Sequence, residues 1–193
     1  MADTPEDWSP ADNPYAIAVS EAQWWLSAVR LAAARLKDRD DPRSMPVSSR
    51  QIDARNLVLA LAQLLSAEQL EQLALEGLGM DSAVGDALAE ARFRYLDAVP
   101  GIQEIRNALT HFEDWSRGEG RGPQRQLITA GEDWRDVARD YWGFGYDPST
   151  QSLRLGPYRI EVESAVSAAT HLHWAIHAAA TAVDERARGA PNP

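Results

Sequence analysis

The sequence contains no cysteine among its 193 residues, which excludes disulfide bonds and thiolate metal ligands. Lysine is nearly absent as well, and Lys37 is its one occurrence. No apolar run approaches the roughly 20 residues that a helix needs to cross a bilayer. The first residues are acidic and include prolines, unlike the basic and apolar start of a signal peptide. We therefore expect a soluble, cytoplasmic protein with no membrane partner.

Basic residues are outnumbered, since 19 lysines and arginines face 29 aspartates and glutamates and give a formal net charge of −10. A surface of that sign repels polyanions on average, which argues against a broad nucleic-acid-binding surface but leaves room for a small basic cleft. The composition, with 45% hydrophobic and 25% charged residues, is typical of a globular protein. The length suits a single domain, which we place at residues 14–188 between disordered tails at 1–13 and 189–193.

Apolar residues recur at helical spacing along most of the chain. This periodicity predicts helices at residues 14–37, 49–65 with a short or kinked continuation to 76, 81–99, 101–117 and 161–188. Residues 124–140 read as partly helical. The stretch that follows carries aromatic residues, a turn sequence and alternating side chains, which predicts a β-hairpin. The expected fold is all-α, an antiparallel helical bundle with a small β-hairpin before the last helix.

One short segment within the predicted helix 101–117 carries side chains suited to chemistry on phosphate esters. Residues 106–115 read RNALTHFEDW. Arg106 supplies a permanent positive fork for phosphate oxygens. His111 has the side chain that gives or takes a proton near neutral pH, and Asn107 adds a polar group beside the arginine. These three residues are the candidate catalytic set.

Helical geometry separates this set from the core. At roughly 100° per residue, an apolar stripe faces the core, and His111 lies roughly 130° from the centre of that stripe. The stripe consists of Ile102, Ile105, Leu109 and Phe112. On one continuous helix Arg106 and His111 would lie roughly 140° apart, so we expect them to flank a cleft rather than to pair directly. The alternative is a solvated polar face on which Asn107 and His111 form a surface pair.

The pattern of an arginine, a polar residue and a histidine on a late helix of a helical domain resembles the HEPN family (higher eukaryotes and prokaryotes nucleotide-binding). Arg106, Asn107 and His111 match the motif residues. The resemblance implies a four-helix bundle that pairs about a two-fold axis and places two copies of the motif across a shared cleft. It implies further that the protein is either a metal-independent ribonuclease of the toxin–antitoxin or phage-defence kind, or a relative that binds a nucleotide or a partner protein without cutting.

For a nuclease of this kind we expect His111 to take the proton of the ribose 2′-hydroxyl, or to deliver one to the leaving 5′-oxygen. Arg106 would neutralise the charge that grows on the phosphorane oxygens. This chemistry needs no metal or cofactor, and DNA should be spared. Candidate substrate-binding residues are Arg117 and Arg121 in the following loop and Trp115, which could stack on a base or form a dimer contact. A solvated loop is the alternative for the arginines.

Two further hypotheses remain at the level of sequence. In the first, the chain is a non-catalytic helical homodimer that binds a nucleotide or a protein such as an antitoxin. In the second, the protein is a metal-dependent enzyme that uses the last predicted helix, where His173 and His177 have a spacing that can hold zinc. No third ligand near them is evident and the metalloprotease motif is missing, so we expect a structural role for these histidines and for His171.

Overall fold

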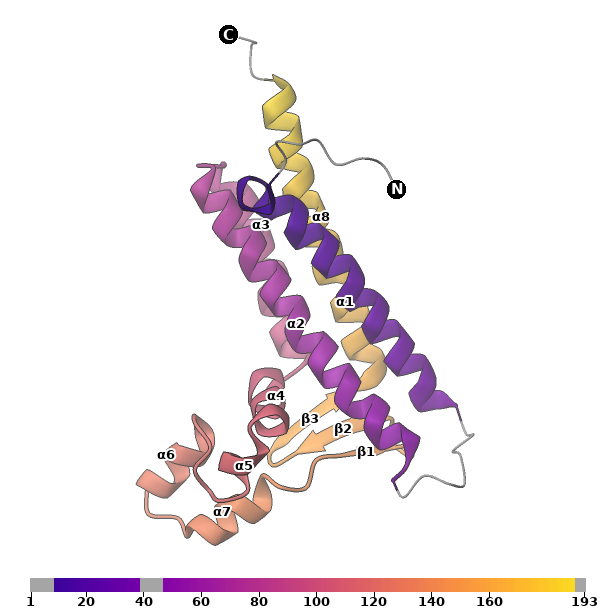
Figure 1. The fold of residues 1–193 in the computed structure, drawn as a ribbon, viewed down its shortest axis with the longest axis vertical. Helices are drawn as coiled ribbons and strands as arrows, with labels where there is room; N and C mark the ends of the chain where they lie inside the picture. Colours follow the sequence, from indigo (N-terminus) through magenta and orange to yellow (C-terminus); the bar gives the residue numbers. More distant parts are fainter. Residues whose placement is uncertain (1–8, 39–46, 190–193) are drawn as a thin grey trace.

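Four long helices form an antiparallel bundle in the computed structural model, which describes residues 9–38 and 47–189. They are α1 (Pro14–Lys37), α2 (Ser49–Gly77), α3 (Ser82–Ala98) and α8 (Val162–Gly189). The chain direction alternates from each helix to the next (Figure 1). Helix α1 packs against α2 and α8, and α3 packs against α8 and α2. The predicted helical bundle with a small β element is thereby confirmed.

The helix ends agree with the predicted ones in most places. Helix α1 has the predicted bounds, and α8 begins and ends one residue later than predicted. The predicted continuation after residue 65 is an unbroken part of α2 rather than a separate helix. At the start of α3, the Asp81 carboxylate accepts a hydrogen bond from the backbone N–H of Ala83, which satisfies one free donor of the first turn.

The predicted tails fall largely outside the described residues. Residues 9–13 carry the short 3₁₀ helix η1 (Pro10–Asp12), which is capped by the Ser9 hydroxyl and contacts α1. Gly189 is the last residue of α8. The remainder of the two tails, 1–8 and 190–193, lies beyond the described chain. Within the described ranges, no helix combines the length and the apolar character that a membrane span needs.

The prediction of one helix over residues 101–117 is wrong. Helix α4 (Ile102–Thr110) ends before His111, whose backbone leaves the helical region with φ −124° and ψ 43°, and the single turn α5 (Phe112–Trp115) follows. Thr110 and His111 are poor helix formers. The Thr110 hydroxyl also donates to the Arg106 carbonyl oxygen at 2.9 Å, which competes with the backbone hydrogen bonds of the last turn.

The break changes which aromatic side chain is buried. Phe112, which a continuous helix would turn toward the core, is 59% exposed, whereas Trp115 is 3% exposed. The Trp115 ring packs against Tyr141 with 5.4 Å between ring centroids. The predicted apolar stripe is therefore wrong at Phe112. Burial of the larger indole ring compensates for the helical hydrogen bonds that are lost.

Two short helices and a sheet complete the end of the bundle where α4 and α5 lie (Figure 1). The helices are α6 (Pro123–Thr129) and α7 (Trp134–Asp140). The sheet has three antiparallel strands rather than a two-stranded hairpin, in the order β1 (Gly145–Asp147), β2 (Ser152–Leu155) and β3 (Tyr158–Glu161). The Gln51 side chain of α2 exchanges two hydrogen bonds with the Tyr146 backbone, which attaches β1 to the bundle.

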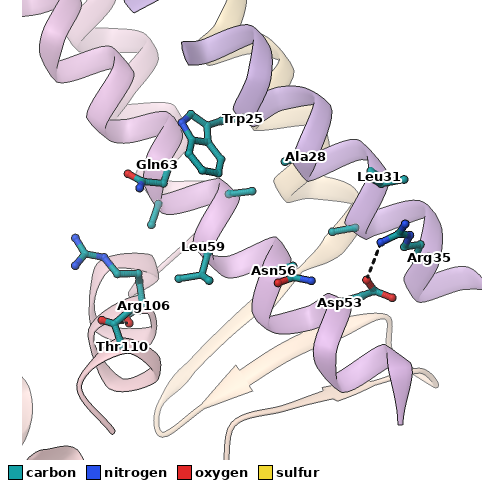
Figure 2. A pocket seen from close by; sticks show the side chains of 13 residues that line it. Trp25, Ala28, Leu31, Arg35, Asp53, Asn56, Leu59, Gln63, Arg106 and Thr110 are labelled. Atoms are coloured by element: carbon teal, nitrogen blue, oxygen red, sulfur yellow. Dashed lines mark hydrogen bonds and ion pairs between the residues drawn. The ribbon is translucent and has the colours of Figure 1, made fainter. Parts of the chain in front are cut away.

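The start of α4 is fixed against the sheet. Gly101 has φ +69°, a conformation that favours glycine, and a Cβ atom there would overlap the ring of Tyr158 on β3. Helix α4 then runs beside α2, so that Arg106 and Thr110 lie close to Leu59 (Figure 2). The sheet and α2 together set the direction in which the motif residues point.

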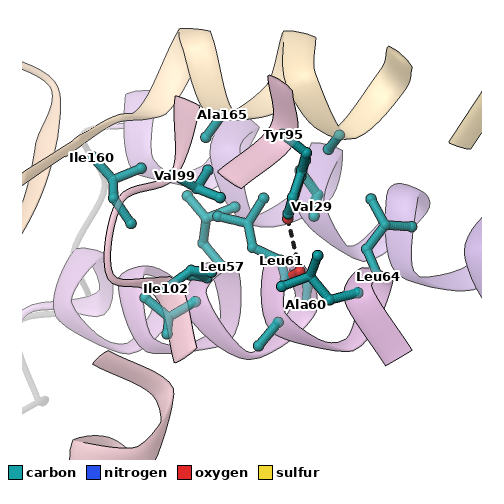
Figure 3. Packing of buried hydrophobic residues seen from close by; sticks show 14 of the residues in the cluster. Val29, Leu57, Ala60, Leu61, Leu64, Tyr95, Val99, Ile102, Ile160 and Ala165 are labelled. Carbon is teal, nitrogen blue, oxygen red and sulfur yellow. Dashed lines mark hydrogen bonds between the residues drawn. The ribbon is translucent and has the colours of Figure 1, made fainter. Parts of the chain in front are cut away.

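The core of the bundle is continuous with the end that carries α4. Leucines of α2 pack against α1, α3 and the first turn of α4, where Ile102 is buried (Figure 3). The Tyr95 hydroxyl, buried with its ring, donates to the Leu61 carbonyl oxygen at 2.7 Å. Ile160 of β3 joins the same cluster. The helix that carries Arg106 thus rests on the main core rather than on a separate one.

Candidate functional site

The three motif residues lie around one pocket of about 280 Å³. Arg106 and Asn107 reach it from α4, and His111 reaches it from the break between α4 and α5. Trp115 and Arg121, which the sequence also singled out, line the same pocket. The structure therefore brings together five of the six candidate site residues.

Arg106 keeps its positive charge available. Its side chain is half-buried, and among residues 9–38 and 47–189 no carboxylate lies within ion-pair distance of its guanidinium. A guanidinium in that state offers its donors to an anionic ligand rather than to a partner in the protein. The geometry suits phosphate binding.

His111 is accessible to a ligand. Its side chain is 58% exposed, and its Nδ1 atom lies 3.9 Å from Oε1 of Glu113. This contact leaves the other ring nitrogen, Nε2, open to a ligand. The side chain can thus exchange a proton with a bound ligand.

Arg117 does not line the pocket. Its Nη2 atom lies 3.0 Å from Oδ1 of Asp114 and 2.6 Å from Oε2 of Glu119, so that two carboxylates neutralise it. Arg125 on α6 is exposed and does not line the pocket either. Of Arg117 and Arg121, the two loop arginines singled out from the sequence, Arg121 lines the pocket together with the motif residues.

Trp115 forms a wall of the pocket but presents little ring surface. Its burial against Tyr141 leaves no open face on which a base could stack. The same burial removes it from the surface that a second subunit could contact. The position of Trp115 therefore fits a structural role in shaping the pocket.

The loop that closes the pocket is held by Gln124, a residue that sequence reasoning missed. The fully buried Gln124 side chain accepts a hydrogen bond from the Gly120 N–H at 2.6 Å and donates to the Trp115 carbonyl oxygen at 2.9 Å. A Cβ atom on Gly120 would lie 2.6 Å from the Trp115 ring and closer still to Gln124. This close approach requires glycine at position 120 and sets the shape of the pocket.

A second depression meets the first at Arg106. It has a volume of about 570 Å³, runs between α1 and α2, and ends on α4 (Figure 2). Arg106 lines both depressions. Sequence reasoning missed this groove because its walls come from three helices that are far apart in the chain.

The histidines of α8 lie elsewhere. His173 is buried, its Nε2 atom lies 3.1 Å from Oε1 of Gln23, and its ring packs edge-on against Trp174. Burial, with smaller contributions from His177 and Arg30, lowers the pKa of His173. In the described part of the chain, no group of three or more histidine, aspartate or glutamate side chains could hold a metal ion. These contacts give His173 a packing role between α1 and α8.

Burial also affects Glu71 on α2, another residue that sequence reasoning missed. Both its carboxylate oxygens are buried and have no hydrogen-bond partner among the described residues. Burial raises the pKa of Glu71 to about 7. Glu71 does not line either depression described above, so its effect concerns the stability of the bundle.

Comparison with known proteins adds no further constraint. The chain matches no protein-family model, no curated protein and no solved structure at a significant level.

Proposed function

We propose that the protein is a HEPN-like, metal-independent endoribonuclease. One observation supports this most directly: Arg106, Asn107 and His111 line a single pocket in which the arginine is not neutralised and the histidine is accessible. A fixed cation beside a side chain that transfers protons is the minimum that cleavage of RNA by its own 2′-hydroxyl requires.

The reaction needs few protein groups. His111 accepts the proton of the ribose 2′-hydroxyl, and the 2′-oxygen attacks the adjacent phosphorus atom. The bond from phosphorus to the 5′-oxygen breaks, and that oxygen takes a proton from the imidazolium or from water. Arg106 neutralises the charge on the phosphorane oxygens, and Asn107 orients the phosphate. The product is a cyclic phosphate, and DNA is not a substrate because it lacks the 2′-hydroxyl.

The proposal includes a homodimer and a role as a toxin or defence component. A two-fold pair would supply a second histidine and a second arginine near the substrate. Trp174 of α8, which is 59% exposed, offers apolar surface for such an interface or for an antitoxin. Light scattering at several concentrations tests the dimer, and growth arrest on expression that is relieved by His111→Ala tests the toxic role.

The direct test is cleavage of labelled RNA by the purified protein with a chelator present. Wild type should cut RNA and leave DNA of the same sequence intact. Arg106→Ala and His111→Ala should each lose activity, whereas Arg117→Ala, which changes an arginine outside the pocket, should keep it. Cleavage that persists in both pocket variants would come from a contaminant and would overturn the proposal.

The second candidate function is a non-catalytic module that binds a nucleotide. The net charge of −10 and the presence of Asp114 in the pocket wall favour it, since both disfavour a long polyanion more than a small ligand. Harmless expression, together with nucleotide binding that requires Arg106 and no detectable cleavage, would support this function over the nuclease.

A further inference from the structure

The groove between α1, α2 and α4 has the features of a ligand site. Its volume of about 570 Å³ lies within the range of small-molecule pockets. Its floor is formed by side chains too small to fill it, namely Ala28, Ala32, Ala60 and Ala62. The space is therefore built into the packing of α1 against α2.

One wall of the groove is an aromatic ring held in a defined orientation. Trp25 projects from α1 over α2 beside Gln63 (Figure 2). Its Nε1–H donates to Oε2 of Glu21 at 2.9 Å, one turn earlier on the same helix. Because that bond fixes the indole, a flat ligand can stack on its ring with little loss of side-chain freedom.

Polar groups along the groove suit the edge of a nucleobase. Asn56 and Gln63 lie about two turns apart on α2, and both are exposed. Neither side chain is hydrogen-bonded to another residue in the described part of the chain. Each amide offers donors and an acceptor, which is the complement that base edges require.

The two ends of the groove differ in charge. At one end Arg35 is paired with Asp53 at 3.7 Å (Figure 2). At the other end lies Arg106, and among the described residues that line the groove it is the cation without a carboxylate partner. A ligand with one anionic group is therefore oriented with that group on α4 and its body toward α1.

We propose that this groove is a nucleoside subsite, in which the base stacks on Trp25, the amides of Asn56 and Gln63 contact the base edge, and the attached phosphate lies on Arg106. The inference rests on the proposed ribonuclease function, because the shared arginine places that phosphate beside His111. The substrate is single-stranded RNA, since a base within a duplex cannot stack on a side chain.

The test is calorimetric titration of the full chain carrying His111→Ala, so that no turnover occurs. The probes are adenosine 3′-monophosphate, uridine 3′-monophosphate and ribose 5-phosphate, the last of which has no base. We expect at least one nucleotide to bind more tightly than the sugar phosphate. Adding Trp25→Ala should weaken that binding roughly tenfold. Adding Gln63→Ala, a change at an exposed helix position that preserves the fold, should weaken it by a smaller factor.

Trp24→Ala is the matched control, because Trp24 is the adjacent tryptophan, is 72% exposed and does not line the groove. The subsite is overturned if Trp25→Ala and Gln63→Ala both bind the nucleotide like the control, or if neither nucleotide binds more tightly than ribose 5-phosphate. It is also overturned if a second copy of the chain occupies the groove. In that case no nucleotide would bind, and Trp25→Ala would convert a dimer to a monomer in light scattering.

The two proposals fail separately. Nucleotide binding that depends on Trp25, in a protein whose wild type cleaves no RNA, would support the subsite and overturn the ribonuclease. Cleavage that requires His111 but proceeds equally well in Trp25→Ala and Trp24→Ala would support the ribonuclease and overturn the subsite.

Discussion

Arg106 and His111 line the same pocket because the helix that carries the arginine ends one residue before the histidine. On an unbroken helix five positions would separate the two side chains by roughly 140°. The backbone of His111 is not helical, and its side chain lines the same pocket as Arg121. The break in the helix is thus the feature that assembles the candidate site.

The two arginines on either side of this break should differ in their effect on RNA cleavage. Arg106→Gln should lower kcat/KM by about 100-fold, because it removes the cation that faces the developing phosphorane charge. Arg117→Gln should change it by less than about threefold, because Asp114 and Glu119 already neutralise that guanidinium. Initial rates on a labelled oligonucleotide measure both. Equal losses would show that the loop arginine also contacts RNA.

Gly120→Ala should destabilise the loop over the pocket. The added methyl group has no space between Trp115 and Gln124, so we expect a loss of about 1–3 kcal/mol in the free energy of unfolding and a loss of cleavage. Gly143→Ala is the control, since nothing lies within 4 Å of the new Cβ atom. Urea denaturation measures the difference. A Gly120→Ala protein as stable as the control would mean that the loop moves freely.

Glu71 should make stability depend on pH. Burial raises the pKa of this carboxyl to about 7 from the 4.5 of an exposed glutamate. Between these values the folded chain holds one proton more than the unfolded chain, so stability falls as the pH rises through this window and is constant above it. Ionisation of Glu71 in the folded chain thus lowers the free energy of unfolding by about 3 kcal/mol.

Glu71→Met should remove that loss and raise the midpoint of thermal unfolding at pH 8 more than at pH 5. Glu76→Gln is the matched control, because it replaces an exposed carboxyl group on the same helix and leaves Glu71 in place. Thermal unfolding of the three proteins at both pH values gives the comparison. The same decline in Glu71→Met as in wild type would assign the pH dependence to another group.

Tyr95→Phe tests the hydrogen bond within the core. The Tyr95 hydroxyl donates to the Leu61 carbonyl oxygen at 2.7 Å in a fully buried setting. Its removal should reduce the free energy of unfolding by about 1–1.5 kcal/mol while the ring continues to pack. Denaturant titration measures the change. A neutral result would mean that the carbonyl oxygen is adequately satisfied by its helical partner.

The long helices could be predicted because their signals are periodic and local. The apolar spacing of residues 14–37 gave both ends of α1, and prolines and glycines marked the ends of the others. The sequence could not distinguish the pocket-lining Arg121 from the ion-paired Arg117. The ion pairs of Arg117 depend on how the chain turns after Trp115.

The features that shape the site could not be predicted, since they depend on contacts between distant residues. The break at His111 is stabilised by burial of Trp115 against Tyr141, which lies 26 positions later in the chain. The role of Gln124 depends on its hydrogen bonds with the backbone of Gly120 and Trp115, which form only once the intervening loop has folded back on α6. The third strand, β3, was missed because only two residues separate it from β2, and two strands of four residues each are too short to be told apart by their alternation.

Helix α8 contacts each of the other three bundle helices, and it is the last of them to leave the ribosome. Val183 of α8 still belongs to the hydrophobic core. The apolar faces of α1, α2 and α3 therefore remain partly exposed until the ribosome has synthesised the chain past this residue. We expect a nascent chain that stops before that point to be recognised by chaperones and proteases. Chains that are truncated before this residue should accordingly be degraded rather than persist as partly folded, partly active fragments.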